Sequence, residues 1–259
     1  MNKKILKLKS EIVSVIKKAL IFIRRVLDKS IFRLNILDTY YKQDECERYK
    51  DCVLLHKIIR SQPPASDRYI EYPWMLENIK ITSGKILDIG STICDRLFAT
   101  LPKTIEVHGI NLNKKLIKNN EIKFKTGDIR KTDYQSEYFD CVVCISTLEH
   151  IGVSGRYSSD EDPKGDIRAM EEINRIMKKG GTLLVTLPYG IKDVLPINKL
   201  YNEERVKNLF RGFEIISQDF YKFSPLWKVW IKTTEKEAGK TDMIKDQWYA
   251  LSLIKAIKK

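Results

Sequence analysis

The most informative segment of this chain is Gly84-Lys85-Ile86-Leu87-Asp88-Ile89-Gly90-Ser91. It begins with a short apolar run that is typical of a buried β-strand, and it continues with an acid and a glycine. The first strand of a doubly wound α/β sheet delivers its backbone to a nucleotide-like ligand in this way. The further glycines of the usual pattern are missing, because Thr92-Ile93-Cys94 follows Ser91. Gly90 alone could be only a turn residue, so the assignment depends on the elements that follow it.

Strand-like and helix-like segments alternate along the rest of the chain. Strands are predicted at 85–89, 105–111, 122–126, 139–145, 182–187, 213–220 and 249–257, and helices at 95–101, 167–178 and 202–210. Gly180 and Gly181 are predicted to end the second helix. The last strand is expected at or near the sheet edge, after a charged insertion at 221–245 that contains Trp227 and Trp230. This alternation predicts a mostly parallel sheet with right-handed crossovers.

The charge of the chain is concentrated near its beginning. The 259 residues carry a formal net charge of +13. Residues 1–35 hold ten Lys and Arg against Glu11 and Asp28, so +8 of this excess lies there and only +5 lies in the remainder. This distribution argues against a basic groove across the whole fold, and we therefore expect no nucleic-acid partner.

Residues 4–29 have the apolar period of a helix, with basic residues on the opposite side. Such a helix could lie on an anionic membrane surface, pack on the domain or a partner chain, or simply be solvated. Its uncharged runs are too short to span a bilayer, and no signal peptide is predicted. We expect a cytoplasmic protein that can associate peripherally with the cytoplasmic membrane face. The break at 61–66 predicts a basic helical extension over 1–60 and a main domain over 61–259.

The sequence predicts no metal site. Cys141 and Cys144 have a C-x-x-C spacing, but residues three apart in a strand point to opposite faces and cannot share a metal. All five cysteines are expected to be reduced and mostly structural. Asp160, Glu161 and Asp162 could bind Mg²⁺ together with an acceptor, although a solvated acidic loop is the simpler interpretation.

Polar residues follow the predicted strands at the edge where the ligand of such a sheet lies. They are Asp88, Gly90 and Ser91 after the first strand, Asn111 after the second, Asp128 and Ile129 after the third, and Ser146, Glu149 and His150 after the fourth. Tyr72 and Trp74 come just before the first strand, so they could wall the pocket or belong to the core.

Four motifs in this order resemble those of the class I S-adenosylmethionine-dependent methyltransferases. Leu87-Asp88-Ile89-Gly90 is similar to their first motif, Gly127-Asp128-Ile129 to the segment whose acid meets the adenine amine, 139–150 to their fourth-strand motif, and 176–183 to the segment that closes it. The resemblance covers residues 68–259. It implies a doubly wound, mostly parallel, seven-stranded Rossmann-like methyltransferase sheet with an N-terminal helical extension, and S-adenosylmethionine as cofactor. The residues implied to bind that cofactor are Asp88, Gly90, Ser91, Asn111, Asp128, Ile129 and Ser146.

A narrower resemblance concerns the acceptor. Gly155-Arg156-Tyr157, Asp162-Pro163-Lys164-Gly165-Asp166 and Leu187-Pro188-Tyr189-Gly190 are similar to a poorly characterised subset related to domain-of-unknown-function family 268. That resemblance implies cell-surface polysaccharide synthesis, and hence a saccharide acceptor, either as a small molecule or linked to a lipid. Another small-molecule acceptor, an RNA acceptor and a non-catalytic membrane-associated scaffold stay open as alternatives.

Two departures from the resemblance favour the scaffold alternative. The ribose hydroxyls are usually held by a carboxylate after the second strand, whereas Asn111 stands here. Glu71 or Asp88 could compensate for it. The missing glycines also reduce how closely the backbone can approach a ligand.

His150 and Glu149 are the candidate catalytic residues. An imidazole has an ordinary pKa of about 6.5, which suits His150 to take a proton from an acceptor hydroxyl. Alternatively, His150 could orient the loop or the cofactor. Glu149 could act as the base instead, or could pair with His150.

Overall fold

The computed structural model describes residues 66–90, 101–113, 121–154, 160–195, 198–224, 229–246 and 248–259. Several predictions fall outside the described residues: the basic helix at 4–29, the boundary near residue 61, most of the helix at 95–101, Ser91, Gly155-Arg156-Tyr157 and Trp227. None of the described helices is long and apolar enough to cross a membrane.

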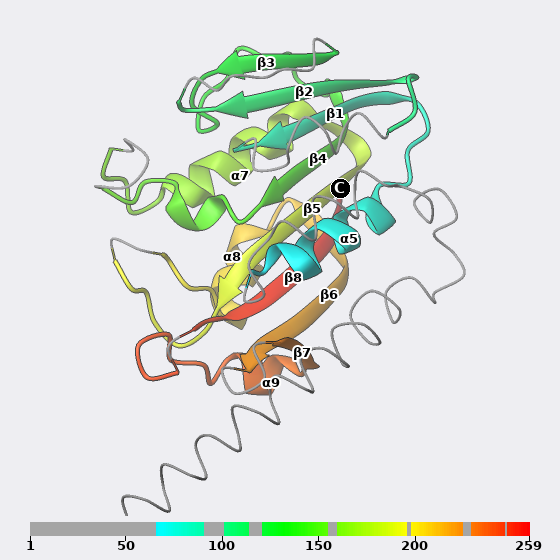
Figure 1. Ribbon diagram of the computed structural model, residues 1–259. Coiled ribbons are helices and arrows are strands. Elements are labelled where there is room, and N and C mark those ends of the chain that lie inside the picture. Colours follow the sequence, from blue (N-terminus) through cyan, green and yellow to red (C-terminus); the bar gives the residue numbers. More distant parts are fainter. Residues whose placement is uncertain are drawn as a thin grey trace, which may run out of the picture. The chain divides into compact units, whose positions relative to one another are not determined.

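The described residues form one mixed, mostly parallel sheet of eight strands, in the order β3-β2-β1-β4-β5-β8-β6-β7 (Figure 1). The strands are β1 Gly84–Ile89, β2 Ile105–Asn111, β3 Ile122–Thr126, β4 Phe139–Ile145, β5 Met177–Tyr189, β6 Phe213–Ser224, β7 Val229–Thr233 and β8 Ala250–Lys258. The five strands from β3 to β5 are parallel, whereas β8 is antiparallel to both β5 and β6. The strand order reverses between β1 and β4, which places a ligand-binding edge there.

Two predictions about the far half of the sheet are wrong. The sheet has eight strands rather than seven, because part of the predicted charged insertion forms β7, which pairs with the end of β6. The last strand, β8, lies between β5 and β6 and not at the edge. Its residues 250–254 are all buried, which is typical of an internal strand. The apolar periodicity of a segment predicts that it forms a strand, but it does not predict which strands lie beside it in the sheet.

The described helices are α5 Arg68–Asn78, the 3-10 turn η1 Leu148–His150, α7 Gly165–Ile176, α8 Glu203–Leu209 and α9 Glu235–Ala238. The predicted glycine cap of α7 is wrong, because the helix ends at Ile176 and β5 begins at Met177. Gly180, with a φ of +72°, and Gly181 lie instead within β5, beside an irregularity in its pairing with β4. The glycines shape the start of a strand and do not end the helix.

The two faces of the sheet are covered by different helices. Figure 1 shows α5 in front of the sheet and α7 behind it. On the α7 face, Val142 and Val185 pack with Met170 and Ile173 in one buried cluster. Each fully buried aliphatic side chain of this kind contributes about 1.5–3 kcal/mol. Thr186 lies next to Val185 and therefore points to the α5 face, where it contacts Glu71 of α5.

Candidate active site

The structure brings those predicted site residues that it describes to one edge of the sheet. Ile89 of β1 is level with Ile110 of β2 and with Cys144 of β4, and Asn111 of β2 is level with Thr126 of β3. The segments that follow these four strands therefore begin side by side.

The turn after β1 is built around Gly90. Its φ is +82°, a region that favours glycine, and its N–H donates to the carbonyl of Ile110 at 2.8 Å. A Cβ atom at Gly90 would lie 2.4 Å from Oγ1 of Thr147, so the ends of β1 and β4 approach too closely for any side chain here. Asp88, two residues earlier, is only 3% exposed. The space beside the Gly90 Cα is occupied by Thr147, so packing between the ends of β1 and β4 requires glycine at this position.

Asn111 has a structural role that the sequence did not indicate. Its side-chain amide donates to the carbonyl of Gly90, and its Oδ1 accepts from the N–H of Asn113 at 2.9 Å. A carboxylate could not donate the first of these bonds. The asparagine therefore links the turn after β1 to the turn after β2.

Asp128, after β3, is held by an arginine fork. Arg130 donates its backbone N–H to Oδ1 at 2.8 Å, and its Nη2 and Nε donate to Oδ2 at 2.6 and 2.9 Å. Burial opposes ionisation of Asp128, but these bonds from Arg130 outweigh it and hold the pKa of the carboxyl below its usual value. Nη1 of Arg130 reaches Asp162 at 2.9 Å. Ile129 is buried beside this network.

At the end of β4, Ser146 and Thr186 converge on Glu71. Both hydroxyls donate to Oε1 of Glu71 at 2.5 Å, and Arg68 pairs with Oε2. The Glu71 side chain is fully buried, and this burial raises its pKa above the ordinary value while Arg68 opposes the rise. Glu71 therefore faces β4 and β5, whereas the sequence suggests it only as a substitute for the ribose carboxylate. Arg68 and Glu71 are three residues apart on a predicted helix, and this spacing could have indicated the ion pair from the sequence.

Glu149 and His150 lie together in the turn η1. Oε1 of Glu149 is 3.6 Å from Nε2 of His150. Oε2 of Glu149 is buried and has no hydrogen-bond partner in the part of the chain that the structure describes. Burial, together with the nearby charge of Glu71, raises the pKa of Glu149 to about 8. The carboxyl is therefore mostly protonated at neutral pH and can exchange a proton near physiological conditions.

Helix α5 also brings a cation to this edge. The Arg68 guanidinium lies 5.7 Å from the centre of the Tyr72 ring. The charges of Arg68, Glu71 and Asp88 all act on the buried Tyr72 hydroxyl, whose pKa burial raises above its ordinary value. Tyr72 thus lies near the first strand, whereas Trp74 is a buried residue of α5. The sequence did not single out Arg68 for a role here.

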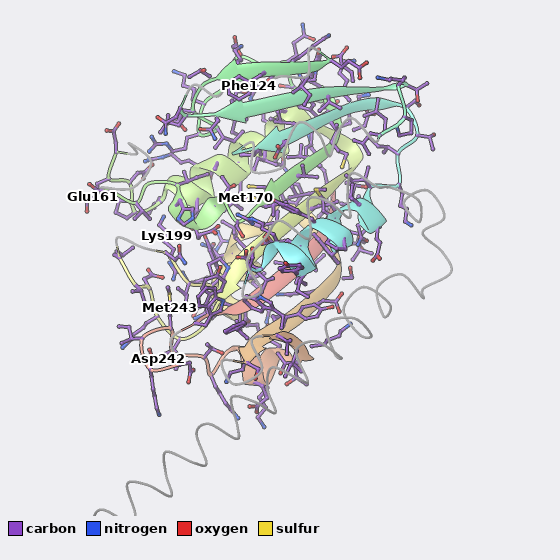
Figure 2. The ribbon with its side chains drawn as sticks, in the orientation of Figure 1. Phe124, Glu161, Met170, Lys199, Asp242 and Met243 are labelled. Carbon is purple, nitrogen blue, oxygen red and sulfur yellow. The ribbon has the colours of Figure 1, made fainter. Side chains whose placement is uncertain are left out.

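Asp162 and Asp166 anchor the C-terminal end of the acidic loop before α7. Asp162 accepts from Arg130 and from Nε of Arg168 at 3.0 Å. Lys199, labelled in Figure 2, donates to the carbonyls of Ile151 and Pro163 at 3.1 and 3.2 Å and to Asp166 at 2.9 Å. Within the described ranges, no group of three or more His, Cys, Asp or Glu could hold a metal ion.

The strand order, with an antiparallel strand between β5 and β6 and polar residues at the ends of β1 to β4, defines the class I methyltransferase fold. Two solved structures, each with a TM-score of 0.50, share it. One is the PH0226 protein of Pyrococcus horikoshii, with 16% identity over 78% of this chain and 99% of that chain. The other comes from a complex of the Haloferax volcanii Trm112 methyltransferase activator with a candidate methyltransferase, with 14% identity over 74% and 90%.

The chain belongs to the DUF268 family, whose model matches residues 104–255. This family is described as "Caenorhabditis protein of unknown function". This match covers more than half of the chain and confirms the predicted relation to that family. No curated protein matches the sequence.

Proposed function

We propose that this protein transfers a methyl group from S-adenosylmethionine to a hydroxyl or amine of a saccharide used in cell-surface glycan synthesis. The observation that carries the methyl-transfer part is the buried Glu149, 3.6 Å from His150 in the turn after β4, at the ligand-binding edge of a class I methyltransferase fold. The saccharide acceptor is supported only by the narrower sequence resemblance.

The residues at this edge fit such a cofactor. The Gly90 turn lies at the end of β1, where such a sheet binds its ligand, and Asp88 supplies a buried acid. Asp128 and Ile129 would meet the adenine, and Arg68, which lies 5.7 Å from the Tyr72 ring and pairs with Glu71, is a cation that could attract the cofactor carboxylate. When bound, S-adenosylmethionine supplies an activated methyl group for in-line displacement.

The residues after β4 would manage the proton of the acceptor. His150 would take the proton from an acceptor hydroxyl through the unprotonated ring nitrogen of a neutral imidazole. The pKa of about 8 makes Glu149 a second group that can hold a proton there, 3.6 Å from the imidazole. An amine acceptor would need only to be neutral.

A non-catalytic scaffold is the second candidate, and two contacts favour it. The amide of Asn111 is used to join two turns, and Asp128 is already engaged by Arg130. Both side chains would have to serve a cofactor in addition to these partners.

Membrane association through residues 4–29 is a separate proposal, motivated by the charge and apolar period of that segment. It would bring the protein to a lipid-linked acceptor. Vesicles of phosphatidylglycerol and phosphatidylcholine should sediment the full chain but not a chain lacking residues 1–35. Equal sedimentation of both would rule out this role for the segment.

Calorimetric titration with S-adenosylmethionine and S-adenosylhomocysteine tests the proposed function. Binding in the micromolar range is expected, and it would justify an acceptor screen that begins with nucleotide-linked and lipid-linked sugars. No binding at millimolar concentration of either ligand would favour the scaffold.

A further inference from the structure

One buried carboxyl group connects the helix before β1 to the ends of two central strands. Glu71 of α5 is 0% exposed and accepts hydrogen bonds from Ser146, which follows β4, and from Thr186 of β5. Its partners lie 75 and 115 residues away in the sequence. Burying a carboxyl is costly unless it is well bonded, so these contacts must be maintained together.

Ser146 adopts a backbone conformation that serine does not favour. Its φ is +43°, and among the described residues only Glu137 shares a positive φ without being glycine. For an L-residue the left-handed region is disfavoured by a factor of about five to thirty. Something in the surrounding structure must therefore hold Ser146 in place.

The hydrogen bonds of Glu71 account for this restraint. Oε1 of Glu71 receives the Ser146 hydroxyl directly, at 2.5 Å. The same oxygen receives the Thr186 hydroxyl proton at 2.5 Å, which leaves the Thr186 oxygen to accept the backbone N–H of Ser146 at 2.9 Å. Glu71 thus fixes both the side chain of Ser146 and, through Thr186, its backbone.

The conformation of Ser146 decides where the next residues lie. The chain turns out of β4 at Ser146, and the N–H of His150 then bonds to the carbonyl of Thr147 at 3.0 Å. Residues 147–150 therefore form one short turn that begins directly after Ser146. Glu149 and His150 are carried by this turn.

We infer that Glu71 is a positioning residue, which holds Ser146 in its left-handed conformation and so places Glu149 and His150 at the ligand-binding edge. The importance of Glu71 for catalysis rests on the proposed function, but its restraint on Ser146 does not. Glu71 acts through Ser146 and Thr186 and is not assigned a contact with the reacting atoms.

The His150 ring provides a readout that needs no acceptor. The chain has three histidines, so the carbon-bound ring protons can be resolved by NMR, and His150→Ala identifies the relevant signal. We expect Glu71→Met, which matches the size of glutamate but cannot accept the hydroxyls, to move or split the His150 signal. Glu71→Gln is the matched control, because its amide oxygen still accepts both hydroxyls and should leave the signal near its original position.

Adding Ser146→Gly to Glu71→Met tests whether the displacement comes from the backbone conformation of residue 146. Glycine adopts a positive φ at no steric cost. In Glu71→Met/Ser146→Gly the His150 signal should therefore return toward the wild-type position. If Glu71→Met does not fold, the pair Ser146→Ala and Ser146→Gly carries the test, with the alanine variant expected to move the signal further than the glycine variant.

Two results would overturn the inference: a His150 signal unmoved by Glu71→Met or Ser146→Ala, or a displaced signal that glycine does not restore. Cofactor titration of the wild-type protein keeps the two proposals apart. Absent cofactor binding with the expected NMR pattern would defeat the proposed function and leave the role of Glu71 intact.

Discussion

Thr147 packs directly against the backbone of Gly90, so that a Cβ atom on Gly90 would lie 2.4 Å from the threonine Oγ1 and 2.7 Å from its Cγ2. The hydroxyl of Thr147 also donates to the carbonyl of Ile145 at 2.9 Å, which fixes the threonine in position. The ends of β1 and β4 are therefore joined at the switch point of the sheet by a contact that only glycine permits.

Gly90→Ala should destabilise the protein more than Gly180→Ala. Both glycines have a positive φ, of +82° and +72°, so each substitution incurs a backbone cost of about 1–2 kcal/mol. A Cβ at Gly180 has nothing within 4 Å, whereas a Cβ at Gly90 overlaps Thr147, which adds about 1–3 kcal/mol. Urea unfolding of the two variants measures the difference. Equal losses would mean that Thr147 moves aside easily.

Replacing Glu149 should change how stability depends on pH. The unfolded carboxyl has a pKa near 4.3, and the folded one has a pKa of about 8. Between these values the unfolded chain releases a proton that the folded chain keeps, so the free energy of unfolding falls as pH rises, by up to about 1.4 kcal/mol per pH unit. Above pH 8 this loss is complete.

Glu149→Gln removes the titrating carboxyl and with it this loss of stability. The variant should therefore gain stability relative to the wild type as pH rises from 5 to 9. Glu71 also has a raised pKa and is present in both proteins, and its charge is one cause of the raised pKa of Glu149. Urea midpoints at the two pH values provide the measurement. A difference between the proteins that does not vary with pH would show that Glu149 titrates normally.

His108 should give the opposite dependence on pH. It lies among Tyr134, Tyr138 and Phe139, and burial lowers its pKa more than the hydrogen bond with Glu106 raises it. Below about pH 6.5 the unfolded imidazole binds a proton that the folded one resists. The stability contribution is therefore complete above pH 6.5 and is lost as pH falls through the folded pKa.

His108→Phe keeps an aromatic ring at this position and removes the titrating group. Between pH 7.5 and 5 the wild type should lose more thermal stability than this variant does. Glu106, whose pKa lies at about 2, does not titrate in this range. Parallel losses in the two proteins would assign the acid sensitivity to other groups.

Asp128→Asn should weaken S-adenosylmethionine binding if the carboxylate meets the adenine amine. Asparagine can still accept the backbone N–H of Arg130, so the turn should survive, but the charge is lost. With its oxygen used in this way, asparagine presents an NH2 group to the adenine amine, which then lacks an acceptor. Leaving that amine unpaired costs about 1–3 kcal/mol, which corresponds to about 5- to 150-fold in affinity. Asp133→Asn is the control, because Asp133 is an exposed partner of Lys125. Unchanged affinity in Asp128→Asn would limit Asp128 to its contact with Arg130.

The central half of the sheet could be predicted from the sequence. Short apolar runs that end in a glycine or an acid, such as the one around Asp88 and Gly90, indicated β1 to β4 in the correct order and placed Asn111, Asp128 and Glu149 at strand ends. These features are local, because a strand alternates its faces every residue and a turn requires its own residue types. The apolar face of α7 was readable for the same reason, although the helix ends one turn before the predicted glycines.

The contacts between these residues could not be predicted from the sequence and are known from the assembled fold. The position of β8 between β5 and β6, the bond from Asn111 to Gly90, and the convergence of Ser146 and Thr186 on Glu71 all join segments that are distant in sequence. No periodicity or motif encodes such contacts, because they depend on how strands pair and how α5 packs on the sheet. The sequence thus determined the fold class and the edge where the candidate site lies, whereas packing determined the burial of Glu149 and the restraint on Ser146, since both depend on the environment that the assembled sheet creates.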